Sequence, residues 1–399
     1  MIGTTIGRYI FTNYIKVCLL VSLIVSVLCV LIDFTQSSAH LSSMANYKNI
    51  YAFTISILRL PFLLLQTLPF IILISGLIYF FIQNKYHELV IMRSIGISAW
   101  QFVFPVCTGA FIIGIIAIFI LNPLSAYSLT QAKNLITNWQ DNNSNFENNL
   151  RPNPWLIQKT SEGETELHAQ SITKNISNKI ILTYINNITE SKLKNYILTL
   201  IKNDKSYVEL LNTNFIFIAP NNTTENIPNI KWIYANKAFL LPGYWLIIKP
   251  QIYTTTSAEL KQSAYLIKTN IQPQFIETYL TDPNTVAFYK LLQKIKIAKN
   301  FGYNPYGFKM VLHYLISLPM LLASMALIAA TTSLRFSRPG NIKLYAIFGI
   351  LAGFALYLTS NIAQSFAKVG LLAPFVAAWT PVAAAIFIGL SFLLKQEDG

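Results

Sequence analysis

The side chains that could do chemistry are few, and they lie at the ends of long apolar stretches rather than together in one cluster. The sequence has no Ser/His/Asp set, no paired carboxylates, and no cysteine spacing or cluster of ligands that would hold a metal. It also has no Gly-x-x-x-x-Gly-Lys-Ser/Thr loop to cradle a nucleotide. We therefore predict no catalytic residue, no metal and no cofactor.

One short segment, residues 84–98, combines charged and apolar residues in a pattern typical of a docking helix. A helix at about residues 84–96 would carry Leu89, Met92 and Ile95 on one stripe and would end at Gly96. Two interpretations remain open: an interfacial helix that lies against lipid headgroups, or a coupling helix that docks into a cytoplasmic motor. The candidate coupling residues are Glu88, Leu89, Met92 and Arg93.

Six stretches without Lys, Arg, Asp or Glu must position these groups, in two sets of three that flank a polar segment. They are residues 17–32, 60–82, 100–121, 310–334, 344–362 and 371–394. A helix of ~20 apolar residues crosses a bilayer, and the first stretch needs residues before Val17 to complete its span. Charged residues are only 12% of the chain, well below the ~25% of soluble proteins. We predict a polytopic α-helical membrane protein with six transmembrane helices, arranged 3 + 3 around a large insertion.

The short loops predict the orientation, because cytoplasmic loops carry an excess of Lys and Arg. One side carries Arg8, Lys16, Lys85, Arg93, Arg335, Arg338, Lys343 and Lys395, whereas the other carries only Lys48, Arg59 and Lys368. Both termini are therefore expected in the cytoplasm and the insertion outside, which in a bacterium would mean the periplasm. The net charge of +14 does not indicate a nucleic-acid partner, because the basic residues form no concentrated patch.

The insertion is predicted to be mostly β, because short runs rich in Ile, Thr, Tyr and Val alternate with turn residues such as Pro242-Gly243. The predicted strands include residues 180–185, 215–218, 231–234 and 244–248. Many short strands favour a sandwich or a jelly roll. After them, Asp282-Pro283 predicts a helix start. Val286, Tyr289, Leu292 and Ile295 would form the apolar face of that helix.

The segment His-Glu-Leu-Val-Ile-Met-Arg-Ser-Ile-Gly-Ile-Ser at residues 87–98 resembles the ELVVMRASG-type loop of the LptF/LptG permeases of the lipopolysaccharide export transporter. The resemblance covers nearly the whole chain: three spans, a β insertion that opens near Trp155, three more spans, and the Leu334-Arg335 step after span four. The Leu-Ile-Asp-Phe segment at residues 31–34, together with the loop motif, resembles LptG more than LptF.

The resemblance implies a permease subunit of an ABC transporter that extracts lipopolysaccharide from the inner membrane and passes it to a periplasmic bridge. The implied partners are an LptB-type ATPase dimer that hydrolyses ATP, a second LptF-type permease, and LptC- and LptA-type periplasmic proteins. The expected domains are residues 1–121, residues 122–309 as a periplasmic β-jellyroll-like domain with helical connectors, and residues 310–399. A secondary transporter, or another lipid-handling membrane protein without an ATPase, is the alternative.

The resemblance also implies a lipid cavity between span one of one permease and span five of its partner. Uncharged walls at residues 19–31 and 347–358 suit such a cavity, although Gly349 and Gly353 suit a tight contact within the chain equally well. The candidate cavity residues are Ser22, Ser26, Asp33, Arg59 and Phe354.

One departure from the family concerns the lipid phosphates. LptG relatives commonly place lysines at the outer end of span one, but residues 30–43 contain no Lys or Arg. Either the phosphates contact the partner permease together with Lys48 or Arg59, or the lipid A differs.

Single ionisable residues also have simpler interpretations. Arg59 suits an interfacial anchor, and Asp33 is expected to cap or to pair near the outer surface. For His313 in span four we expect a neutral ring bonded to a helix carbonyl.

Overall fold

The chain folds into two compact units, which we call the helical unit (Met1–Asn143 with Thr281–Gly399) and the insertion (Ser144–Leu280). The computed structural model describes residues 2–42, 49–142, 155–160, 163–176, 178–186, 191–200, 207–218, 230–254, 260–261, 263–271, 281–300, 304–333 and 342–397. The insertion is shorter at both ends than the expected residues 122–309, because the segments on either side of it pack within the helical unit.

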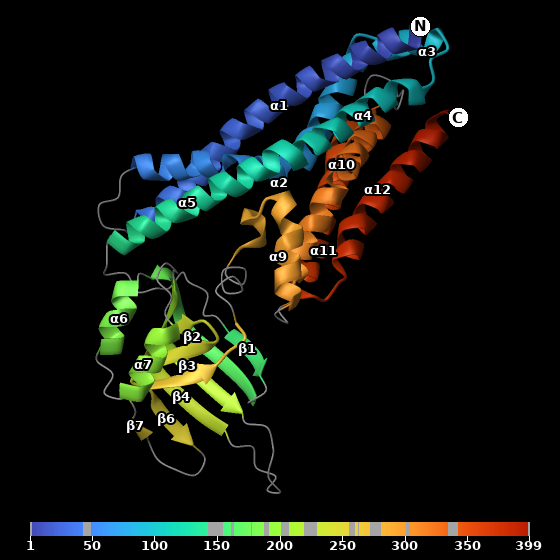
Figure 1. The fold of residues 1–399 in the computed structure, drawn as a ribbon. Coiled ribbons are helices and arrows are strands. Elements are labelled where there is room, and N and C mark those ends of the chain that lie inside the picture. The colour runs from blue at the N-terminus through green and yellow to red at the C-terminus, as the bar shows by residue number, and fades with distance from the viewer. Residues whose placement is uncertain are drawn as a thin grey trace, which may run out of the picture. The chain divides into compact units, whose positions relative to one another are not determined.

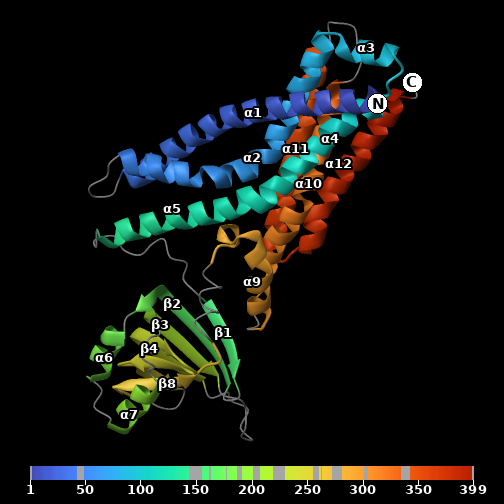
Figure 2. The ribbon, with the colours of Figure 1, turned by 45° about the horizontal axis from the view of Figure 1, so that its top comes forward.

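The helical unit contains the membrane-spanning helices (Figures 1 and 2). Its elements are α1 (Ile2–Leu41), α2 (Asn49–Lys85), α3 (Glu88–Ser94), α4 (Ala99–Ile116), the π-helix η1 (Ala117–Leu121), α5 (Asn122–Asn142), the 3-10 helix η2 (Pro283–Thr285), α9 (Phe288–Asn300), α10 (Tyr306–Ser333), α11 (Ile342–Val369) and α12 (Pro374–Glu397). Within the described residues, six helices are long and apolar enough to cross a membrane, three on each side of the insertion. The predicted 3 + 3 architecture is confirmed.

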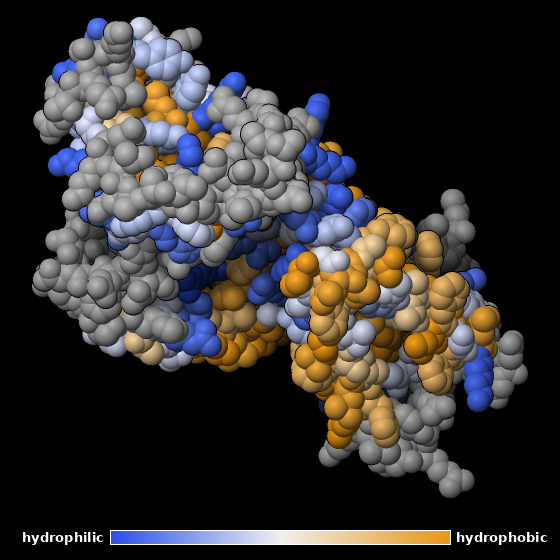
Figure 3. Space-filling view, turned by 90° about the horizontal axis from the view of Figure 1, so that it is seen from below, coloured by the Kyte–Doolittle hydropathy of each residue, from blue (hydrophilic) through white to orange (hydrophobic). Residues whose placement is uncertain are grey.

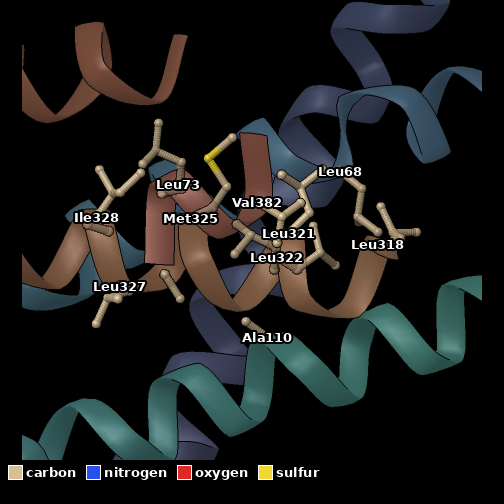
Figure 4. Packing of buried hydrophobic residues seen from close by; sticks show 14 of the residues in the cluster. Leu68, Leu73, Ala110, Leu318, Leu321, Leu322, Met325, Leu327, Ile328 and Val382 are labelled. Atoms are coloured by element: carbon tan, nitrogen blue, oxygen red, sulfur yellow. The ribbon is translucent and has the colours of Figure 1, made fainter. Parts of the chain in front are cut away.

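Helix α10 is the centre of the helical unit, because α2, α4, α11 and α12 all pack against it. Leu318, Leu322 and Met325 on this helix are fully buried, and Figure 4 shows them among side chains from α2, α4 and α12. Of its most apolar 18 residues, 67% are buried, against 11% for span one and 17% for span five. The unit is thus organised around one buried helix, with two spans largely exposed.

Small residues let neighbouring helices approach α10 closely, as expected in lipid, where packing rather than water drives helix association. A Cβ atom at Gly114 of α4 would lie 2.5 Å from the Cα atom of Pro319 on α10. A Cβ atom at Gly76 of α2 would lie 2.6 Å from the Cβ atom of Ala329. Both contacts exclude larger side chains unless the helices separate.

Span three does not end at residue 121 but continues through η1 into α5. The Asn122 side chain then accepts a hydrogen bond from the Phe288 backbone N–H at 2.8 Å, which ties this helix to the start of α9. Farther along α5, the Lys133 ammonium lies 2.8 Å from the Asp282 carboxylate. The two connectors of the insertion are therefore joined to each other, which is why both belong to the helical unit.

Asp282 caps η2, as its position before Pro283 predicts, by accepting a hydrogen bond from the Asn284 backbone N–H. Burial acts to raise the pKa of the Asp282 carboxyl, but the ammonium of Lys133 and the N–H of Asn284 outweigh it and hold that pKa below its usual value. The residue is thus a charged link between α5 and η2.

The predicted apolar face of the helix after Asp282 is wrong in part. Helix α9 begins only at Phe288, and its buried residues are Leu291, Ile295 and Ala298. Tyr289 and Leu292 are exposed. The buried face follows the i, i+4, i+7 spacing from Leu291, so the register of the stripe differs from the one that starts at Val286.

The insertion is built on one antiparallel sheet, which confirms the predicted β-rich domain. Its strands are β1 (Trp155–Thr160), β2 (Gly163–Ile176), β3 (Tyr207–Ile218), β4 (Ile230–Leu241), β5 (Tyr244–Ile248), β6 (Gln251–Thr254), β7 (Leu260–Lys261) and β8 (Ala264–Lys268). The order is β1-β2-β3-β4-β5-β8, and β6 pairs with β4 and β7. Gly243, at a φ of +81°, forms the predicted turn before β5.

The predicted strand at residues 180–185 is wrong, because these residues lie in helix α6 (Asn178–Asn186), which is followed by α7 (Ser191–Leu200). Ile181 and Ile185 are fully buried in one cluster with Phe239, whereas Thr183 between them is exposed. The apolar residues therefore face the sheet at helical spacing, and this tertiary contact overrides the β propensity of the isoleucines.

We predict that Gly114→Ala destabilises the helical unit by about 1–3 kcal/mol, because the added methyl group would overpack the backbone contact between α4 and α10. Gly7→Ala on α1 is the matched control, since its Cβ atom would lie 3.7 Å from Pro105, an ordinary van der Waals distance. The apparent melting temperature of each purified variant in the same detergent measures the effect. Equal shifts for both variants would contradict the packing argument.

Candidate functional site

The predicted coupling segment is a short helix held between two special backbone positions. Helix α2 ends at Lys85, His87 has a φ of +59°, and α3 then spans seven residues, Glu88–Ser94. Gly96, at a φ of +89°, follows it as the sequence predicts, because glycine adopts this conformation without steric cost. The segment is thus a separate helix between spans two and three rather than an extension of either.

Glu88 is held against the start of α1. The Tyr9 hydroxyl lies 3.4 and 3.5 Å from the two carboxylate oxygens of Glu88 and is oriented to donate to them. These distances are long for a hydrogen bond to a carboxylate. The half-buried carboxylate is therefore oriented by α1 but keeps room to accept a second donor.

The predicted apolar stripe of α3 divides into a packed part and an exposed part. Met92 is half-buried and packs against the core of the helical unit. Ile95 is 69% exposed, and Ile91, four residues earlier, is 55% exposed. The side chains of Leu89 and Arg93 lie outside the described residues. The exposed apolar pair is therefore Ile91 and Ile95, which their i, i+4 spacing could have indicated.

Asp33 and Arg59 come together between α1 and α2. The guanidinium of Arg59 lies 3.6 Å from the Asp33 carboxylate, and the Ser37 hydroxyl donates to the second carboxylate oxygen at 3.3 Å. The Asp33 side chain is only 10% exposed, whereas that of Arg59 is 34% exposed. A buried carboxylate is costly unless it is paired, so the expected pairing of Asp33 is confirmed and Arg59 is its partner.

The two serines proposed for the cavity wall direct their hydroxyl groups into α1 itself. Ser22 donates to the Leu19 carbonyl at 2.9 Å, and Ser26 donates to the Ser22 carbonyl at 2.6 Å. Because both hydroxyl groups are bonded within the helix, the two serines contribute little polarity to the surface of α1. Around them α1 exposes Leu19, Leu20, Leu23, Ile24, Val27, Leu28, Leu31 and Ile32. This broad uncharged face is the largest apolar feature of the helix.

Helix α11 has two faces, and its glycines lie on the packed one. A Cβ atom at Gly349 would lie 2.6 Å from the Thr332 hydroxyl oxygen, and one at Gly353 would collide with Leu73. Of the two interpretations, the tight contact within the chain is therefore correct for both glycines. The other face exposes Ile347, Leu351, Phe354 and Leu358. Figure 3 shows orange, apolar residues over much of the helical unit at the right of the view.

The expected hydrogen bond from His313 to a helix carbonyl is wrong. The His313 and Phe375 rings meet edge to face with centroids 5.8 Å apart, and within the described part of the chain His313 makes no hydrogen bond to a helix carbonyl. Lys48, one of two bases considered for the lipid phosphates, lies outside the described residues. Among the residues that the structure describes, no group of three or more His, Cys, Asp or Glu side chains could hold a metal.

The sequence matches the family described as lipopolysaccharide export system permease LptF/LptG over residues 8–395. The match covers nearly the whole chain, including all six spans and the insertion, and it does not distinguish LptF from LptG. No curated protein matches the chain at a significant level.

We predict that Arg59→Gln destabilises the chain more than the double variant Arg59→Gln/Asp33→Asn does, because the single change leaves a buried carboxylate without its partner. The coupling between the two sites should be roughly 0.5–3 kcal/mol, measured as a double-mutant cycle of apparent stabilities in detergent. Lys85→Gln, which removes an exposed cation from the end of α2, should change little. Additive effects of the two single changes would mean that the ion pair contributes nothing.

Proposed function

The chain belongs to the LptF/LptG family of lipopolysaccharide export system permeases, and from this membership we propose the following function. The protein is the permease subunit of an ABC transporter that extracts lipopolysaccharide from the inner membrane and passes it to a periplasmic bridge. Partner ATPases supply the energy. The Leu-Ile-Asp-Phe segment at residues 31–34 favours the LptG type.

The observation that carries the proposal is the exposure of spans one and five. Of the most apolar 18 residues of each span, only 11% in span one and 17% in span five are buried. In every other span at least 33% are buried. An uncharged face on each of two separate helices suits a second permease and a lipid that is held between the two chains. The family membership supports lipopolysaccharide as that lipid, whose acyl chains need an apolar wall.

The proposed orientation rests on the loop charges. Both termini and α3 face the cytoplasm, and the insertion lies in the periplasm, where it would meet LptC- and LptA-type proteins. Asp33 and Arg59 then lie toward the periplasmic side of spans one and two. Since Arg59 is paired and partly exposed, it can offer some positive charge to a lipid phosphate without being an isolated charge in the membrane.

Coupling to an LptB-type ATPase dimer is assigned to α3. The exposed pair Ile91 and Ile95 offers an apolar contact, and the half-buried Glu88 offers a charge at its edge. An apolar anchor with a charged rim is typical of a docking surface. Because the sequence has no nucleotide-binding loop of its own, the proposal requires this contact.

We predict that Glu88→Lys weakens co-purification of the ATPase and abolishes export while the chain still inserts into the membrane. A charge-assisted contact contributes about 1.5–3 kcal/mol, which corresponds to about 10- to 140-fold in affinity. Tyr9→Phe is the matched control, because it removes the hydroxyl that orients Glu88 but leaves its charge. If Glu88→Lys still bound the ATPase fully, α3 would be an interfacial helix and not a coupling helix. If Tyr9→Phe lost as much ATPase binding as Glu88→Lys, the role of Glu88 would be to position α3.

We further predict that a photo-crosslinker at Ser22 or Ser26 captures lipopolysaccharide in cells, because both positions lie on the uncharged face of α1. A crosslinker at Phe387, which is 70% exposed on α12, is the control and should capture bulk phospholipid. The glycolipid is identified in the crosslinked band by its sugar and by mass spectrometry. Equal capture of lipopolysaccharide at both places would indicate annular lipid and would remove the support for a cavity at α1.

A further inference from the structure

A groove of about 890 Å³ lies between the start of α1 and the start of α4, next to the residues that follow α3. It is separate from the exposed faces of α1 and α11 discussed above, and Ile95 is the residue that it shares with the contact proposed for the ATPase. The groove lies wholly within the helical unit, at the end where the loops are rich in Lys and Arg.

One end of the groove, at the first turn of α4, is lined by Trp100 and Gln101, and Arg8 of α1 also lines the groove. The Arg8 side chain is exposed. Within the described ranges, no carboxylate lies within ion-pair distance of Arg8, and the nearby Glu88 contacts Tyr9 instead. The groove therefore presents a positive charge that the described part of the protein does not neutralise.

The start of α4 adds to this positive character. The Ser98 side chain makes no capping hydrogen bond with the first turn of α4, and the N-terminus of a helix carries a partial positive charge. Pro105 has no N–H, so the carbonyl of Gln101 cannot receive its usual helical hydrogen bond and is available to a donor. The polar end thus suits an anion that also carries a donor, such as a hydroxyl group.

Most of the groove wall is apolar. Phe11 from α1 and Phe104 and Pro105 from α4 are part of it. The Thr108 hydroxyl donates to the Pro105 carbonyl at 2.9 Å, so its hydrogen-bonding capacity is used within α4. From Gln101 to Thr108 the wall extends about 10 Å along the helix, at 1.5 Å per residue. The groove therefore combines one exposed cation with a mainly apolar wall.

We propose that this groove binds one anionic phospholipid, with its phosphate at Arg8 and an acyl chain along Phe11 and Phe104. A free phosphate would use only the polar end, and a zwitterionic lipid would bring its own cation to Arg8. Basic sites between transmembrane helices select anionic headgroups in this way. The assignment to the cytoplasmic leaflet rests on the proposed orientation. Because Ile95, Gly96 and Ile97 form part of the wall, the lipid lies beside the segment that follows α3.

Native mass spectrometry of the purified full-length chain tests the proposal, with phosphatidylglycerol and phosphatidylcholine supplied in equal amounts. The expected result is one phosphatidylglycerol that survives detergent washing, with phosphatidylcholine retained at least tenfold less. Arg8→Gln should lower phosphatidylglycerol retention about tenfold, a loss typical of one charge-assisted contact. Lys395→Gln, which removes an exposed cation elsewhere at the same end of the unit, should leave retention unchanged.

The shape of the groove is tested separately. Gly7→Leu should block retention of the lipid, because the side chain at this position points toward Pro105, whereas Gly7→Ala should keep it. A benzophenone side chain at Gln101 should capture phosphatidylglycerol in the assembled transporter, and this result does not depend on whether Arg8→Gln folds.

Three outcomes would overturn the proposal. Equal retention of the two lipids, or an equal loss in Lys395→Gln, would mean ordinary annular lipid. Capture of a protein instead of a lipid from Gln101 would make the groove a protein contact. None of these measurements uses lipopolysaccharide or ATP, so failure here leaves the transport proposal untouched, and failure of transport leaves this one untouched.

Discussion

The packing of four membrane-spanning helices around α10 is the interaction on which the rest of the helical unit depends. The contacts use side chains and close backbone approaches such as that of Gly114 to Pro319. In a bilayer no hydrophobic effect drives apolar helices together, so this tight packing must supply the association. Since α2, α4, α11 and α12 pack against α10, and α1 packs against α2 and α4, the outer surfaces of these helices remain for other partners.

Several polar groups of the exposed span α1 are satisfied within the helical unit. Ser22 and Ser26 are satisfied within α1, and the charge of Asp33 is compensated by Arg59 on α2. The face of α1 between them is therefore uncharged, and the one ion pair lies near one end. Under the proposed function, the acyl chains of the lipid would meet no unpaired charge along this face, and Arg59 would be the cationic residue near its headgroup.

Both ends of the helical unit join segments that are far apart in the sequence. At one end, Asn122 and Lys133 of the continued span three bind the segment Asp282–Phe288 that leads into α9. At the other, Tyr9 of α1 contacts Glu88 of α3. The starting turns of α1 and α4 also form the groove proposed for an anionic phospholipid.

Local patterns in the sequence determined the six spans, the β-rich insertion, the strand at residues 244–248 and the helix that ends at Gly96, because length, apolar period and glycine conformation act within a few residues. Only the tertiary structure decided which face each element buries. Residues 180–185 became helical because Ile181 and Ile185 meet Phe239. Met92 is packed and Ile95 is not, and Gly353 faces Leu73 rather than lipid. Burial depends on neighbours that are distant in the chain, and no local pattern records them.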